Sequence, residues 1–206
     1  MTLRILAPVL LLPLFATAAQ LPELRTEPIG GGTVFFVKNT SSQPLTGFLI
    51  ELVDYPGSSY TLWQDEITSE PVAPGAEKRI QVTNMTAGAV PDYMKIQAAI
   101  YAAGSTAGVP DKVTQFIERR KAVLATTREL IGRLQKGETA SDLKQWADSL
   151  QPVGKVKLNS QPVINQTAAR SLVSETAAKL ASHSADETLA NLRASEKALA
   201  ASKPAL

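Results

Sequence analysis

The chain has 206 residues, 44% of them hydrophobic, with a formal net charge of +2, one histidine and no cysteine. The absence of cysteine excludes disulfides, thiolate metal sites and a thiol nucleophile, and the single histidine excludes a multi-histidine metal centre. The nearly neutral charge argues against nucleic-acid binding. No phosphate-binding or dinucleotide-binding motif is present, and we expect no cofactor.

The first nineteen residues predict an export signal. Arg4 supplies a positive charge, residues 5–15 are apolar, and Ala16, Thr17 and Ala18 provide the small side chains of a cleavage site. This apolar run is shorter than the roughly 20 residues that span a bilayer. We therefore expect residues 1–19 to be removed, leaving a periplasmic or secreted protein with no membrane span.

Charge is unevenly spread over the rest of the chain. Residues 20–110 carry five basic and nine acidic side chains, whereas residues 111–206 carry fifteen and ten. Two differently built halves would explain this difference. Alternatively, the halves attract each other, or the basic half meets an acidic component of the cell envelope.

Residues 20–109 have the period of two that is typical of short antiparallel strands. Three consecutive glycines at 30–32 predict a hairpin turn. The expected strands cover residues 33–38, 45–53, 60–66, 77–84 and 93–102. In the last strand, strict alternation places Met94, Ile96, Ala98 and Ile100 inward, and Tyr93, Lys95, Gln97 and Tyr101 outward.

Two segments carry a resemblance to known proteins. Residues 37–45, then a strand, then Pro74-Gly75 before another strand, resemble the immunoglobulin-type β-sandwiches of exported bacterial proteins, with FxLYD and CARDB-like modules nearest. Residues 100–108, which lead into a helix, resemble a layout of uncharacterised extracytoplasmic proteins that tend to carry Asp where this chain has Ala103. The resemblance covers about residues 25–135. It implies a sandwich with a binding or scaffolding role and carries over no functional residue.

From about residue 110 the hydrophobic period becomes helical. Pro110 begins a long helix that Gly137 ends, and Thr139 with Asp142 caps a short helix, so that both lie within residues 110–151. Residues 152–163 contain two prolines and a glycine and are expected to be a linker. Residues 164–206 predict two Ala-rich helices that form a loose hairpin, dock on another surface, or remain a mobile tail. The fold class expected is α+β, an N-terminal antiparallel Ig-like β-sandwich followed by a helical region.

Residues with catalytic potential have structural explanations. His183 follows a helix C-terminus, and its neighbours Ser182, Ser184 and Asp186 are too close in sequence to form a triad. Three glycosylation sequons, at Asn39, Asn84 and Asn165, coincide with turn or cap positions. Paired carboxylates, Asp65 with Glu66 or Glu51 with Asp54, leave open a hydrolase.

The candidate contact surface combines aromatic and basic side chains. Its residues are Tyr55, Tyr60, Trp63, Arg119 and Arg120. We expect the two arginines, with Lys121, to project from the long helix toward solvent or toward acids such as Glu77. The function expected is that of an exported, non-enzymatic interaction or scaffold protein that binds another protein of the cell envelope. The alternatives are a module that binds a small ligand or a polysaccharide, and the hydrolase.

Overall fold

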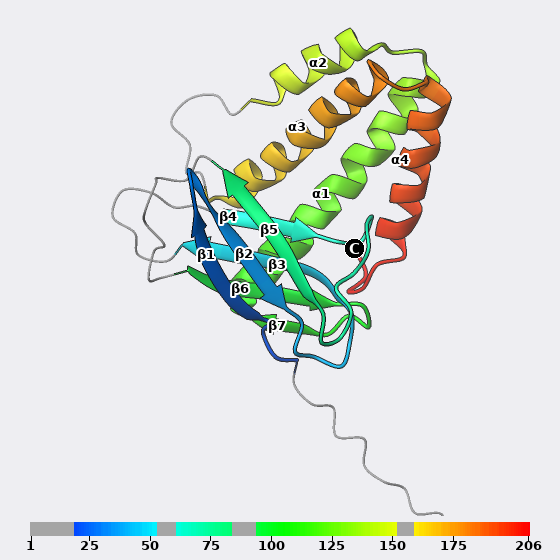
Figure 1. Cartoon of the computed structure of the whole chain (residues 1–206). Coiled ribbons are helices and arrows are strands. Elements are labelled where there is room, and N and C mark those ends of the chain that lie inside the picture. The colour runs from blue at the N-terminus through cyan, green and yellow to red at the C-terminus, as the bar shows by residue number, and fades with distance from the viewer. Residues whose placement is uncertain (1–18, 53–60, 84–93, 152–158) are drawn as a thin grey trace, which may run out of the picture.

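The computed structural model describes residues 19–52, 61–83, 94–151 and 159–206. These residues form strands first and helices afterwards, which confirms the predicted α+β class (Figure 1). The expected export signal, except for Ala19, lies outside the described residues. So do Tyr55 and Tyr60 of the candidate contact surface, and Tyr93.

The described strands make two antiparallel sheets. The first has the order β1-β2-β5 and contains β1 (Glu23–Ile29), β2 (Gly32–Lys38) and β5 (Glu77–Thr83). The second has the order β4-β3-β6-β7 and contains β3 (Leu45–Leu52), β4 (Thr61–Asp65), β6 (Met94–Tyr101) and β7 (Thr106–Gly108). Five of these strands match the prediction within about one residue.

Strands β1 and β7 are absent from the sequence prediction for local reasons. β7 has only three residues, too few to show a period. β1 contains Pro28, which a sheet tolerates because β1 is an edge strand. The predicted glycine turn joins β1 to β2, and a φ of +78° at Gly31 confirms that it is a hairpin turn.

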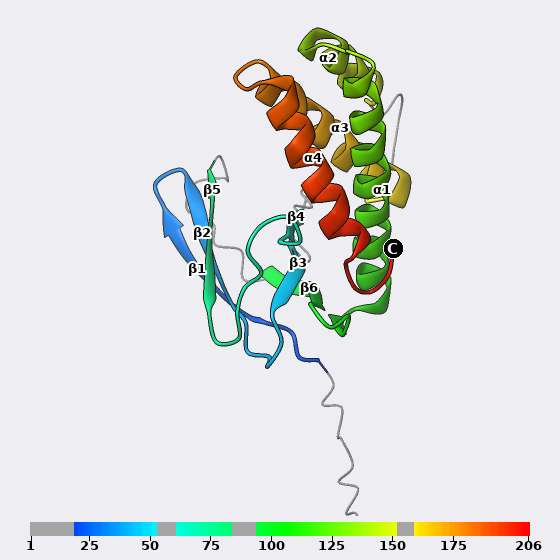
Figure 2. The same ribbon diagram turned by 90° about the vertical axis from the view of Figure 1, so that its right-hand side faces the viewer.

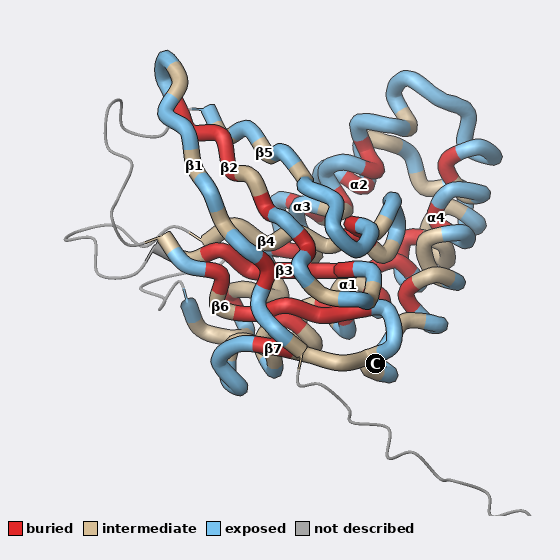
Figure 3. The backbone as a smooth tube through the Cα atoms, turned by 60° about the horizontal axis from the view of Figure 1, so that its bottom comes forward, coloured by how far each residue is buried: buried red, intermediate tan, exposed pale blue. Residues whose placement is uncertain are grey.

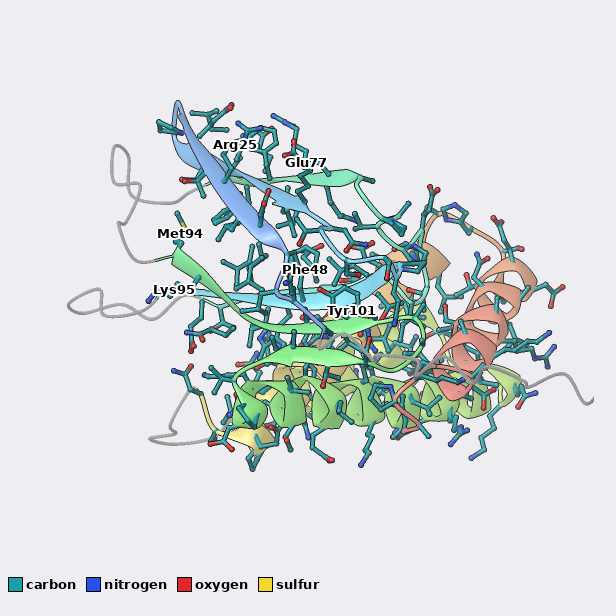
Figure 4. The ribbon with its side chains drawn as sticks, turned by 90° about the horizontal axis from the view of Figure 1, so that it is seen from below. Arg25, Phe48, Glu77, Met94, Lys95 and Tyr101 are labelled. Atoms are coloured by element: carbon teal, nitrogen blue, oxygen red, sulfur yellow. The ribbon has the colours of Figure 1, made fainter. Side chains whose placement is uncertain are left out.

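A hydrophobic cluster joins the two sheets. Phe35 and Val37 of β2 belong to the same cluster as Phe48 and Ile50 of β3 and Tyr101 of β6, and all five are buried. Figure 4 shows Phe48 and Tyr101 between the sheets, while Arg25 and Glu77 lie on the first sheet. Each such side chain contributes about 1.5–3 kcal/mol on burial. Burial also raises the pKa of the Tyr101 hydroxyl, which donates a hydrogen bond to the carbonyl of Gln20.

Strand β6 is buried on both faces, and its side chains depart from the predicted alternation. Its register with β3 shifts between Leu49 and Ile50, so that Gln97 is an extra residue. From Ala98 onward, each residue of β6 therefore lies on the face opposite to the one that strict alternation predicts. The prediction that Ile100 shares a face with Ile96, opposite to Tyr101, is therefore wrong: Ile96 and Tyr101 belong to the cluster between the sheets, and Ile100 belongs to the cluster that contains Phe116 of the following helix.

In the described part of the chain, four helices follow the strands. They are α1 (Pro110–Gln135), α2 (Ala140–Ser149), α3 (Gln161–Leu180) and α4 (Ala185–Ala200). The predicted start at Pro110, the stop at Gly137 with φ +85° and the Thr139–Asp142 capping box are confirmed. Helix α3 begins inside the segment predicted to be a linker, with Pro162 in its first turn, where the missing N–H costs no hydrogen bond.

The C-terminal helices pack against α1 more than against each other. Helices α1, α2, α3 and α4 share one hydrophobic cluster, which includes Leu130, Leu143, Val173 and Leu192. Figure 2 shows these helices on the opposite side of the second sheet from β1, β2 and β5. In Figure 3 the buried residues run along β3 and β6, at the centre of this layered arrangement. The loose hairpin that the Ala-rich pattern favours is thus replaced by docking on α1.

Two ion pairs join the strand-rich half to the helical half among the described residues. Lys112 of α1 contacts Glu51 of β3 at 2.8 Å, and Arg120 of α1 contacts Asp65 of β4 at 2.8 Å. In both pairs the helix supplies the cation and the sheet supplies the anion. This polarity agrees with the interpretation that the unevenly charged halves attract each other.

Gly47 of β3 makes room for α1, and we predict that Gly47→Ala destabilises the protein. A Cβ atom there would lie 2.6 Å from Nη2 of Arg120 and 2.8 Å from Cζ of Phe116. We expect a loss of about 1–3 kcal/mol in the free energy of unfolding, measured by urea denaturation. The control is Gly132→Ala in α1, where a Cβ would meet nothing within 4 Å. This control should be neutral or slightly stabilising, and equal losses in both variants would contradict the steric argument.

Candidate functional site

Arg120 holds the long helix against the second sheet. Its side chain is fully buried, its Nε lies 2.8 Å from Oδ2 of Asp65, and its Nη2 lies 3.0 Å from Oδ1. The same Nη2 donates to the carbonyl of Thr46 at 2.9 Å. The prediction that Arg120 projects from the helix as a contact residue is therefore wrong, because its charge is neutralised inside the fold.

The spacing of residues in the sequence could have indicated that Arg120 is buried. Arg120 lies four residues after Phe116 and four before Leu124, so all three occupy one helix face. Phe116 and Leu124 are both buried, and the guanidinium of Arg120 lies 5.1 Å from the ring centroid of Phe116. An arginine centred on an apolar stripe requires a buried partner, and the acid at the end of β4 provides it.

Arg119 has a different environment from its neighbour. One residue along a helix turns the side chain by about 100°, so Arg119 is directed away from Gly47 and toward β4. It is half-buried, and its guanidinium lies 5.6 Å from the ring centroid of Trp63. Within the described ranges it makes no hydrogen bond or ion pair. Burial lowers the pKa of Arg119, and the nearby charge of Asp65 partly opposes this effect.

Trp63 and Arg119 lie where two cavities meet. The first cavity has a volume of about 310 Å³ and the second about 290 Å³. Both cavities are lined by Trp63 of β4, Arg119 of α1, and Ala168 and Ser171 of α3. The predicted contact residues Trp63 and Arg119 are therefore brought together, from positions 56 residues apart, at the centre of one hollow.

The two cavities form a groove that follows three elements. Along α1 its lining runs from Lys112 through Arg119 to Val123, and along α3 it runs from Ile164 through Ala168 to Glu175. Along β4 it runs from Thr61 to Asp65. These spans correspond to roughly 16 Å of helix and roughly 13 Å of strand. We call this feature the β4 groove; its contribution from α3 is absent from the sequence prediction.

Strand β4 is also an edge of its sheet. It pairs with β3 on one side only, and no other described strand pairs with it. Its five residues are all partly exposed. An edge strand offers unpaired backbone N–H and C=O groups to a further extended segment.

The candidate acids and the histidine have structural partners. Asp65 pairs with Arg120, whereas the neighbouring Glu66 contacts Lys78 of β5 at 2.5 Å, so the two carboxylates serve different cations. Glu51 pairs with Lys112, and Asp54 lies outside the described residues. His183 is exposed, and its Nδ1 lies 2.9 Å from Oγ of Ser182.

Asn39, the first residue of one sequon, is buried and holds a turn together through its hydrogen bonds. Its side-chain amide donates to the carbonyls of Gln43 and Val72, both at 2.8 Å, and its Oδ1 accepts from the backbone N–H of Ser41 at 3.0 Å. A buried amide with these partners is not available for modification in the folded protein. This explains the Asn-Thr-Ser sequence at the end of β2 as turn chemistry.

No family model, no curated protein and no solved structure matches this chain. Among the helices in the described ranges, none has the length and apolar character that crossing a membrane requires. The site must therefore be interpreted from its own geometry.

We predict that Asp65→Asn strongly destabilises the fold, because it leaves the charge of Arg120 buried without a counter-ion. The expected loss in the free energy of unfolding is about 3 kcal/mol, measured by chemical denaturation. Adding Arg120→Met should recover most of that loss.

The matched control is Arg128→Gln, which removes a surface pair between Arg128 and Glu196. Arg128 is exposed and Glu196 is partly exposed, and we expect a change of at most about 1 kcal/mol. Equal effects of Asp65→Asn and Arg128→Gln would contradict the assignment of Asp65 and Arg120 as a buried structural pair.

Proposed function

We propose that this protein is an exported, non-enzymatic interaction protein of the cell envelope that binds an extended segment of a partner protein in the β4 groove. In this proposal the two sheets are an immunoglobulin-like sandwich that serves as a scaffold. The helical region supplies the second wall of the binding site.

The observation that carries the proposal is the placement of Trp63 and Arg119 together at the middle of the groove. The tryptophan provides a large apolar surface and the arginine a directional charge, and these residue types dominate the energy of protein interfaces. In addition, the ring of Trp63 is held by Phe116, with 5.5 Å between ring centroids, so it loses little freedom on binding.

The shape of the groove supports an extended polypeptide as its occupant. A length of roughly 13 Å along β4 matches about four residues of a strand. The edge of β4 gives such a segment a row of backbone partners, and side-chain pockets on either side of Arg119 give selectivity.

The two alternative functions have less support. The ring of Trp63 is half-buried and lies against Phe116 and Arg119, unlike an open platform on which a sugar ring stacks. For the hydrolase, Asp65 and Glu66 are each tied to a structural cation.

A photo-crosslinking experiment tests the proposed function. A photoreactive phenylalanine analogue is placed at Ser171, which lines both cavities, or at Ala194, an exposed control position on α4. On irradiation in envelope extracts, we expect defined protein adducts at Ser171, absent at Ala194 and strongly reduced by Trp63→Ala in a variant whose circular dichroism is unchanged. The same adducts at both positions, or no adduct at Ser171, would refute binding in the groove.

A further inference from the structure

We propose that Arg119 recognises the carboxylate of an aspartate or glutamate side chain in the middle of the bound segment. This inference rests on the proposed function and specifies the chemistry of the partner. It follows from the charges in the groove, from the position of Arg119 and from the shape on either side of it.

Among the described residues that line the groove, Arg119 is the cation without an ion pair. Lys112 is neutralised by Glu51 at 2.8 Å, and Asp65 is already engaged in two hydrogen bonds with Arg120. Glu175, an exposed residue of α3, lines the second cavity and acts on Arg119 only through space, without an ion pair. In the described residues, Arg119 therefore keeps its guanidinium hydrogen bonds available while its charge is already partly desolvated.

The ligand group that fits is a carboxylate. A guanidinium presents two parallel N–H groups that match the two oxygens of a carboxylate. The first cavity adds hydroxyl and amide side chains from Thr61, Gln115 and Thr167, and its described lining contains no second cation without an ion pair. One positive charge balances one carboxylate, whereas a doubly charged phosphate would leave negative charge in the groove.

The position of Arg119 indicates an internal side chain and not a chain terminus. The groove continues on both sides of Arg119, toward Lys112 and toward Val123. A terminal carboxylate would leave one of the two cavities empty. In an extended segment, residues two positions before and after the acid point to the same side, about 7 Å away.

Beside its polar residues, each of the two cavities has an apolar side chain in its lining. Ile164 lines the first cavity and Leu172 the second, on the two sides of Ala168. The preferred partner sequence is therefore apolar–x–acid–x–apolar. An extended strand of this pattern would place its acid at Arg119 and one apolar side chain in each cavity.

A displayed library of random octapeptides, panned on the purified full chain, tests this inference. We expect the enriched peptides to carry Asp or Glu at one fixed position, flanked at a distance of two by apolar residues. Each enriched peptide is then synthesised with its acid and with the matching amide, and its affinity is measured by calorimetry. Replacing Glu by Gln in the peptide should weaken binding at least about tenfold.

Variants of the protein test whether Arg119 is the residue that recognises the acid of the peptide. Arg119→Gln should weaken binding of the acidic peptide at least about tenfold and leave the weaker amide peptide nearly unchanged. Arg128→Gln, which removes a basic side chain outside the groove, should change affinity less than about twofold. The Glu-to-Gln comparison uses the unaltered protein, so it stays decisive even if Arg119→Gln impairs folding.

The outcomes separate the inference from the proposed function. Peptides that bind in the groove with no preference for an acid, or acidic peptides indifferent to Arg119, overturn the role of Arg119 and leave the groove as a peptide site. A library that yields no groove-binding peptide also overturns it. The Ser171 crosslink then decides the proposed function independently.

Discussion

The buried pair of Arg120 and Asp65 is the constraint on which the arrangement of the two halves depends. A fully buried guanidinium is costly unless a carboxylate and further acceptors surround it. Asp65 and the Thr46 carbonyl accept hydrogen bonds from Nε and Nη2 of Arg120, whereas its buried Nη1 has no hydrogen-bond partner among the described residues. This requirement fixes how far along β3 and β4 helix α1 lies and how it is rotated. Gly47 completes the fit, because any larger residue there would collide with Arg120 and Phe116.

The candidate site follows from that rotation. Once Arg120 is directed into the sheet, the geometry of the helix directs Arg119 toward the free edge at β4, beside Trp63. Helix α3 then closes the other side of the groove because it packs on α1 and α2. A structural ion pair thus positions a neighbouring arginine that has no partner of its own in the described part of the chain. Adjacent, chemically identical residues have different environments: Arg120 is buried in the fold and Arg119 lines the groove.

Much of the secondary structure is predictable because its causes are local. The turn at Gly31, the start at Pro110, the stop at Gly137 and the Thr139–Asp142 box all act within a few residues. Strict alternation fails in β6, where the extra residue Gln97 depends on pairing with β3. Likewise, α3 and α4 have few large apolar residues on the faces that they bury. How these two helices pack depends on the surface that α1 and α2 present.

The periods, caps and glycine turns depend on short stretches of chain, so the order of strands and helices can be derived from the sequence alone. The sequence also names Trp63 and Arg119 among the candidate contact residues, but it does not show that they lie side by side. Which of two adjacent arginines is buried, and whether a groove exists beside them, depends on contacts between residues distant in sequence. Asp65 and Arg120 are 55 positions apart, and the α3 wall of the groove lies about 50 positions further along. Only folding brings these segments within hydrogen-bond distance, because burial of charge is decided by what surrounds a side chain in space.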